Sequence, residues 1–315
     1  MEPSPTTDAS ANAPLRVSRR ILLGGAAASA FLVACGSSDD GSSDADNSTP
    51  GASGATDTST GSTPGIPFGT YVIAQRFPQD VQEPGLQRLP ISLATADGRL
   101  VSDGPDSLNA EVTDVDANPL GLSISTTRRD LESGPYYSFR VPIETPGIYY
   151  LVVEGGPEGG AAFQVMEPGS VAVPGPGDTM PPFDTPTVDD SRGVDTICTR
   201  EPEPCPFHDV TLTEALAAGR PVAYYVGTPA FCSTGSCAPA LEALIVAHER
   251  FGDTFTFVHA EVFSDADGTA IAPAVTAVGM TYEPALFITD ATGMVVERLD
   301  AVWDQTELNE RLSQV

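Results

Sequence analysis

The stretch VAYYVGTPAFCSTGSCAP, residues 222–239, decides how the C-terminal part of the chain folds. Its first five residues are an apolar run with the length and composition of a buried strand. Cys232 and Cys237 follow in a loop, and after residue 240 the apolar residues recur at helical spacing. The stretch therefore predicts a strand, a cysteine-bearing loop and a helix in direct succession.

Regular elements are predicted on both sides of this stretch. Thr211 and Glu214 have the spacing of a capping box and predict a short helix that ends at Gly219. Beyond the helix at 240–251, we expect a strand at 254–263, a helix at 271–278, a hairpin of 285–289 with 294–299, and a helix at 306–312. The order α-β-α-β-α-β-β-α predicts an α/β sheet with a parallel crossover and an antiparallel hairpin.

The spacing of the two cysteines decides where each one lies. Positions five apart on a helix differ by about 140° at 3.6 residues per turn, so Cys232 and Cys237 cannot share a helix face. We expect Cys232 in the loop and Cys237 at the helix N-terminus, with Gly235 allowing the bend. A disulfide between them is feasible, and the helix dipole lowers the pKa of a thiol there. The motif itself contains no acidic or basic proton shuttle.

The C-terminal region resembles the thioredoxin fold over residues 196–315. The cysteine pair lies at a strand-to-helix junction, and YEPALFITD at 282–290 is similar to the proline, strand and turn of membrane-anchored thiol-disulfide oxidoreductases. The resemblance implies that Pro284 is a cis-proline facing the cysteine pair and that Glu283 lies beside the disulfide. The chain departs from that family in having four residues between the cysteines, and Phe231 in place of the usual Trp.

The cysteine pair has a catalytic and a structural interpretation. By resemblance, Cys232 attacks a target disulfide, Cys237 resolves the mixed disulfide and Pro284 shapes the substrate groove, with no cofactor. The spacing and the absent Trp favour instead a static disulfide in a non-catalytic envelope scaffold. A thiol peroxidase is a further alternative, because Thr228 and Pro229 precede Cys232.

Cys198 and Cys205 lie in a proline-rich segment outside the expected core elements. Their stiff surroundings favour a structural disulfide, with a relay pair for Cys232 and Cys237 as the alternative. A thioredoxin-fold copper carrier would combine two thiols with a histidine, for which His208 and His259 are the candidates. A hydrogen-bonded core histidine is the commoner interpretation of His259, so no metal site is predicted.

The N-terminal segment predicts the cellular location. Arg19 and Arg20 open a stretch that resembles a twin-arginine export signal, and residues 21–34 are apolar but too short to span a bilayer core of about 30 Å. The end of this run resembles the lipobox of bacterial lipoproteins, in which Cys35 is lipidated after removal of residues 1–34. We therefore expect an extracytoplasmic protein held on the bacterial cell membrane by lipid alone.

Three regions lie between Cys35 and the α/β region. Residues 36–65 consist almost wholly of small and polar residues and are expected to be a disordered tether. Residues 66–166 show short strand patterns separated by turns, which predicts an immunoglobulin-like β-sandwich acting as a spacer or binding module. Residues 167–195 contain six prolines and are expected to be a semi-extended linker that separates the sandwich from residues 196–315.

The charge of the chain restricts its partners. The 315 residues include 43 Asp and Glu against 15 basic residues, all of them Arg, for a formal net charge of −28. Such a surface repels phosphates, which excludes nucleic acid and electrostatic docking on anionic lipid. The absence of Lys excludes Schiff-base chemistry by that residue. The expected partners are disulfide- or thiol-containing proteins of the cell envelope.

Overall fold

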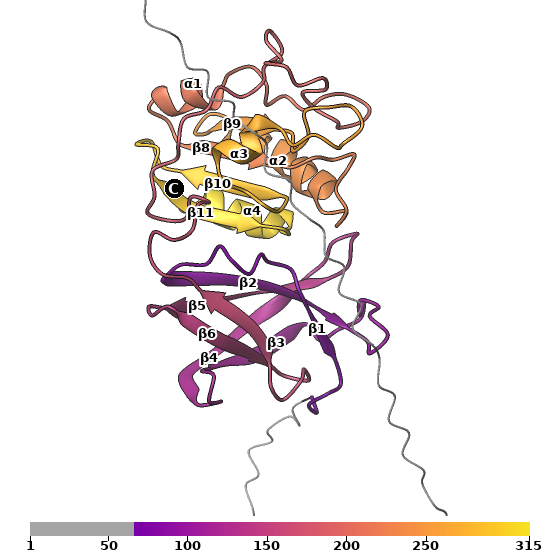
Figure 1. Cartoon of the computed structure of the whole chain (residues 1–315). Helices are drawn as coiled ribbons and strands as arrows, with labels where there is room; N and C mark the ends of the chain where they lie inside the picture. The colour runs from indigo at the N-terminus through magenta and orange to yellow at the C-terminus, as the bar shows by residue number, and fades with distance from the viewer. Residues whose placement is uncertain (1–65) are drawn as a thin grey trace, which may run out of the picture. The chain divides into compact units, whose positions relative to one another are not determined.

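The computed structural model describes residues 66–315, which are mostly β-sheet with few helices (Figure 1). In that part of the chain, no helix is long and apolar enough to cross a membrane. The predictions for Arg19 and Arg20 as an export signal, for Cys35 as a lipid anchor and for residues 36–65 as a tether lie outside the described residues.

The first seven strands form one antiparallel sheet that folds around its own core, as expected of a β-sandwich. They are β1 Val72–Gln75, β2 Gly85–Ala94, β3 Ser107–Thr113, β4 Pro119–Arg129, β5 Tyr136–Ile143, β6 Gly147–Val153 and β7 Ala161–Val165, in the order β1-β2-β5-β4-β3-β6-β7. Most of β4 pairs with β3, but its last residues, Arg128 and Arg129, pair with β5. Through this switch the two halves of the sheet enclose side chains such as Leu89, Phe139 and Phe163.

The remaining elements form a four-stranded mixed sheet covered by helices. They are α1 Leu212–Ala217, β8 Val222–Val226, α2 Cys237–Phe251, β9 Thr256–Ala260, α3 Pro273–Ala277, β10 Ala285–Thr289, β11 Val295–Asp300 and α4 Gln305–Leu312. The strand order is β11-β10-β8-β9, and only β8 and β9 are parallel, joined through α2. The predicted element order and the capping box of Thr211 and Glu214 are confirmed.

Both faces of the four-stranded sheet are buried, as the unbroken apolar runs of β8 and β10 require. Because side chains alternate along a strand, Tyr225 and Leu286 pack with α2 and α4, whereas Tyr224 and Phe287 pack with α1 and α3. This arrangement fixes the strand-to-helix junction between β8 and α2, where the two cysteines lie.

The proline-rich segment 167–195 does not separate the two sheets, in contrast to the expectation from its composition. Val295 exchanges backbone hydrogen bonds with the segment, accepting from Gly177 and donating to Asp178. Val173 and Met180 are buried in the core beneath β10. The physical reason is that β11 is an edge strand with unpaired backbone groups, which an extended segment can satisfy.

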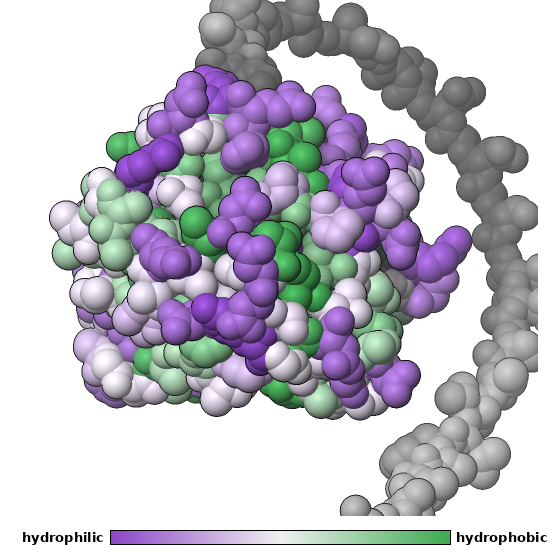
Figure 2. All heavy atoms as spheres, turned by 90° about the horizontal axis from the view of Figure 1, so that it is seen from above, coloured by the Kyte–Doolittle hydropathy of each residue, from purple (hydrophilic) through white to green (hydrophobic). Residues whose placement is uncertain are grey.

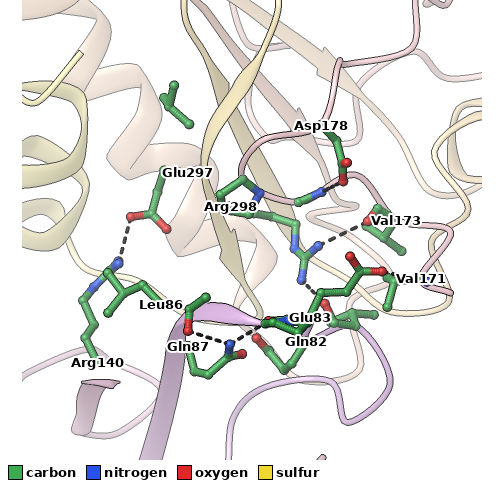
Figure 3. A pocket seen from close by; sticks show the side chains of 16 residues that line it. Gln82, Glu83, Leu86, Gln87, Arg140, Val171, Val173, Asp178, Glu297 and Arg298 are labelled. Atoms are coloured by element: carbon green, nitrogen blue, oxygen red, sulfur yellow. Dashed lines mark hydrogen bonds and ion pairs between the residues drawn. The ribbon is translucent and has the colours of Figure 1, made fainter. Parts of the chain in front are cut away.

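Buried ion pairs join the sandwich to the last elements of the chain. Arg88 donates to both carboxylate oxygens of Glu307, at 2.8 and 2.7 Å, and both side chains are almost fully buried. Beside this pair is a pocket in which Arg298 donates to the backbone carbonyl of Val81 and Arg140 pairs with Glu297 (Figure 3). The charged side chains that line the pocket therefore bind neighbouring protein groups.

On the face of the molecule seen from above, the hydropathy of the surface changes over short distances. Figure 2 shows hydrophilic side chains interspersed with short hydrophobic strips on that face. Single exposed apolar residues, such as Val188 and Ile271, are ordinary features of protein surfaces.

Candidate functional site

A disulfide joins Cys232 and Cys237 at the junction of β8 and α2, with their Cα atoms 5.9 Å apart. As the spacing predicts, Cys232 lies in the loop and Cys237 is the first residue of α2. Gly235 permits this path because its φ is +66°, a conformation that residues with a Cβ rarely adopt. Cys237 is fully buried and Cys232 is half-buried, so an incoming sulfur can reach only Cys232.

Polar hydrogens surround the sulfur of Cys232. The backbone N–H of Cys237 donates to it at 3.3 Å, and the Thr234 hydroxyl lies at 3.2 Å. An N–H at the start of a helix and a neighbouring hydroxyl both favour negative charge on sulfur. When the disulfide is reduced, this environment is that of a stabilised thiolate at Cys232.

A carboxyl group lies against the other sulfur. Glu283 Oε2 is 3.3 Å from Cys237 Sγ and accepts a hydrogen bond from the backbone N–H of Thr228 at 3.0 Å. Burial raises the pKa of Glu283 to about 7; the Thr228 hydrogen bond opposes that rise, and the nearby charge of Glu261 adds to it. Glu283 can therefore take up and release a proton near neutral pH, beside Cys237.

Pro284 lies at the start of β10 and follows a cis peptide bond with Glu283. It approaches the end of β8, because a Cβ placed on Gly227 would lie only 3.1 Å from Pro284 Cβ. Tyr225 on the same strand donates its hydroxyl to the carbonyl of Cys237 at 2.8 Å. These contacts hold β8, β10 and the first turn of α2 together around the disulfide.

A groove begins beside the disulfide at the N-terminal end of α2. It reaches the loop between β4 and β5 and the start of α4, and four of its lining residues are acidic. They are Asp130, Glu132, Glu242 and Asp304, and Gly235, Ala238, Val246 and Trp303 are among the other lining residues.

The other two cysteines differ from the sequence-based expectation. Cys198 and Cys205 are free buried thiols and are not joined by a disulfide. They lie with His208 and His259, so both histidines that were candidates for a copper site are grouped with this pair. Pairing with Cys205 and with the two imidazoles lowers the pKa of Cys198, whereas the same thiol pairing and burial raise the pKa of Cys205.

No known family model matches the chain, and no curated protein matches it either. The chemistry of the disulfide site is therefore inferred from its own contacts.

Proposed function

We propose that the chain is an exported thiol-disulfide oxidoreductase whose residues 196–315 form a thioredoxin-like domain. A strand-loop-helix unit bearing two cysteines, a mixed sheet with a parallel crossover and the cis bond at Pro284 support this proposal. The sandwich is proposed to be an immunoglobulin-like spacer or binding module. The groove beside Gly235 offers a path for a target chain.

The proposed reaction transfers two electrons to a target disulfide. The thiolate of Cys232 attacks one target sulfur, which forms a mixed disulfide and releases the other target sulfur as a thiolate that takes a proton. Glu283 then removes the proton from Cys237, whose sulfur attacks Cys232 and releases the second target sulfur. The target is reduced to two thiols, and the Cys232–Cys237 disulfide is formed. The same steps in reverse oxidise a target dithiol.

One observation favours this proposal over a static, purely structural disulfide. Cys232 is accessible and surrounded by donors, while buried Cys237 touches a carboxyl group that titrates near neutral pH. A disulfide that only joins a loop needs neither asymmetry in access nor a proton acceptor. We therefore propose Cys232 as the nucleophile, Cys237 as the resolving thiol and Glu283 as the group that transfers the proton.

A redox titration tests the proposal directly. The full chain is equilibrated with glutathione or dithiothreitol buffers, and the state of Cys232 and Cys237 is measured by alkylation and peptide mass. We expect a midpoint above about −300 mV, because structural disulfides are more resistant to reduction than that. In addition, Cys237→Ser should accumulate mixed disulfides through Cys232, and Cys232→Ser should form none. A pair that stays oxidised below that potential would falsify the oxidoreductase.

We also propose that the protein is anchored outside the cytoplasm by lipid on Cys35, with envelope proteins as its targets. The residues that support this are the paired Arg19 and Arg20 and the apolar run that ends at Cys35. Cys35→Ala should abolish incorporation of labelled fatty acid and move the chain from the membrane to the soluble fraction. Replacing both arginines by Lys should hold the precursor inside the cell.

A further inference from the structure

Four buried side chains lie close together at the Nδ1 edge of the His259 ring. The opposite edge of this ring, at Nε2, contacts the backbone carbonyl of Gly227. The four side chains are Cys198, Cys205, His208 and His259, with exposed fractions of 5, 5, 1 and 0%. Every pair of their nearest ligand atoms lies within 4.8 Å. We propose that these four residues bind one Zn²⁺ ion in a closed tetrahedral site, separate from the Cys232–Cys237 disulfide.

The distances within the cluster fit the edges of a tetrahedron around zinc. Zn–N bonds of about 2.05 Å and Zn–S bonds of about 2.3 Å place two nitrogens about 3.3 Å apart and a sulfur and a nitrogen about 3.6 Å apart. The nitrogens His259 Nδ1 and His208 Nε2 are 3.2 Å apart. Cys205 Sγ lies 3.4 Å from His208 Nε2 and 3.3 Å from His259 Nδ1. These three atoms are therefore spaced like the ligands of one tetrahedral ion, and Cys198 Sγ lies within 4.8 Å of each of them.

The donor set selects the metal. Two thiolates with two imidazoles in a tetrahedral arrangement are typical of zinc, whereas Mg²⁺ and Ca²⁺ prefer oxygen ligands. Two thiolates also neutralise the charge of Zn²⁺, so the complete site can be buried without an unpaired charge. All four positions come from protein side chains, which is typical of a structural rather than a catalytic zinc.

Neighbouring groups orient the ligands. His259 Nε2 lies 3.0 Å from the carbonyl oxygen of Gly227, which places the proton on Nε2 and leaves the Nδ1 lone pair facing the cluster. The backbone N–H of Cys205 donates to Cys198 Sγ at 3.3 Å, a contact that stabilises a thiolate. Of the four ring nitrogens, only His208 Nδ1 lacks a partner among residues 66–315. It faces away from the proposed ion if Nε2 is the ligand.

The proposed site connects the segment 198–208, which precedes α1, to the loop 227–230, which precedes Cys232. Three ligands come from a C-x6-C-x2-H segment and the fourth from β9. Thr199 follows the first ligand and accepts a hydrogen bond from the N–H of Ala230 at 3.1 Å, while His259 contacts Gly227. The metal would therefore fix both ends of the loop 227–230 without taking part in disulfide exchange.

Zinc binding and a Cys198–Cys205 disulfide exclude each other, because the disulfide removes both sulfur ligands. The full chain, isolated without added chelator, is expected to contain one zinc per chain by elemental analysis. After metal removal under reducing conditions, a titration with Co²⁺ alone should give one equivalent of the visible absorption bands of a tetrahedral cobalt–thiolate site. Zn²⁺ should then displace the cobalt.

Matched variants assign the ligands. Cys205→Ser and His208→Asn should each weaken Co²⁺ and Zn²⁺ binding by at least about 100-fold, more than the loss of an outer contact costs. His248→Gln changes the remaining histidine, which is exposed, and should bind metal as the unaltered chain does. The double variant Cys232→Ser, Cys237→Ser should also bind one equivalent, which separates this site from the redox pair.

Three results would overturn the zinc site. The first is a reduced unaltered chain that binds neither Co²⁺ nor Zn²⁺, or that binds Cu⁺ alone. The second is an octahedral cobalt spectrum. The third is a Cys198–Cys205 disulfide as the form isolated from the cell envelope, found by peptide mapping. Because the unaltered chain gives the spectrum, the outcome does not depend on whether a ligand variant folds.

Discussion

Glu283 Oε2 lies 3.3 Å from Cys237 Sγ, although 46 residues separate the two in the chain. The contact arises because Glu283 precedes β10 and Cys237 begins α2, two elements that meet at the end of β8. In the proposed reaction Glu283 is the proton acceptor that the cysteine motif itself lacks, so we predict that the reactivity of the buried sulfur depends on pH.

Glu283→Gln should slow the resolution of a mixed disulfide by Cys237, because the amide cannot accept the thiol proton. General base catalysis contributes about 100-fold or more, so we expect a loss of that order in the second step and little change in the attack by Cys232. Stopped-flow measurements with a model disulfide separate the two steps. Glu249→Gln, an exposed change on α2, is the control. Equal rates of the resolution step in Glu283→Gln and Glu249→Gln would contradict the proton-transfer role of Glu283.

The stability of the oxidised protein should depend on pH through Glu283. Its pKa of about 7 lies above the ordinary 4.5, so the folded state holds a proton that the unfolded state releases between these values. Folding therefore loses stability as the pH rises from about 4.5 to about 7. Compared with the unaltered chain, Glu283→Gln should be more stable at pH 8 and no more stable at pH 4. Urea denaturation at both pH values measures the difference in the free energy of unfolding between the two proteins. A difference that is the same at pH 4 and pH 8 would contradict the raised pKa of Glu283.

Removal of Glu307 should destabilise the whole of residues 66–315. Burial disfavours the charge, but Arg88 and the hydroxyls of Tyr136 and Ser138 hold the pKa of Glu307 down to about 2. Glu307→Ala leaves Arg88 buried and unpaired, which costs about 3–5 kcal/mol in the free energy of unfolding. Glu310→Ala, which breaks a more exposed pair with Arg129, should cost less than about 1 kcal/mol.

The same ion pair gives an acid limit to stability. Because the folded pKa of Glu307 is below the unfolded value of 4.5, its contribution is complete above pH 4.5 and is lost as the pH falls toward 2. The unaltered chain should therefore lose stability over that range more steeply than Glu307→Gln. Thermal unfolding followed by circular dichroism at several acidic pH values checks this, and parallel curves for the two proteins would contradict it.

Gly235→Ala should destabilise the cysteine loop through its backbone alone. A Cβ at this position meets no atom within 4 Å, so the cost comes from the positive φ of 66°. A left-handed conformation costs an ordinary residue about 1–2 kcal/mol, whereas Asn tolerates it better. The reduction potential and the melting temperature of Gly235→Ala should both move more than those of Gly235→Asn. Equal effects would indicate that side-chain contacts, rather than φ, decide.

Local patterns in the sequence predicted much of the second sheet. The buried run of β8, the capping box of α1 and the hairpin of β10 and β11 all follow from interactions among near neighbours. Strands β3 and β4 were not predicted. Much of β4 is exposed along both faces, which leaves weak apolar alternation, and its identity as a strand depends on pairing with β3 and β5.

The misjudged segment 167–195 shows the limit of composition. Six prolines indicated a separating linker, yet Val173 and Met180 between them are buried and backbone groups pair with β11. Proline stiffens a chain into an extended form, but composition does not tell whether a sheet edge lies within reach to pair with it.

The sequence by itself determined where Cys232 and Cys237 lie relative to the strand and the helix, because five-residue spacing and a glycine leave one local solution. Only the tertiary structure decided what surrounds them. Glu283 beside Cys237, His259 beside Cys205 and Glu307 beside Arg88 are separated by 46, 54 and 219 residues. Helices and strands follow from neighbours along the chain, whereas a site depends on how the packed elements bring distant side chains together, and that packing is set by the whole core.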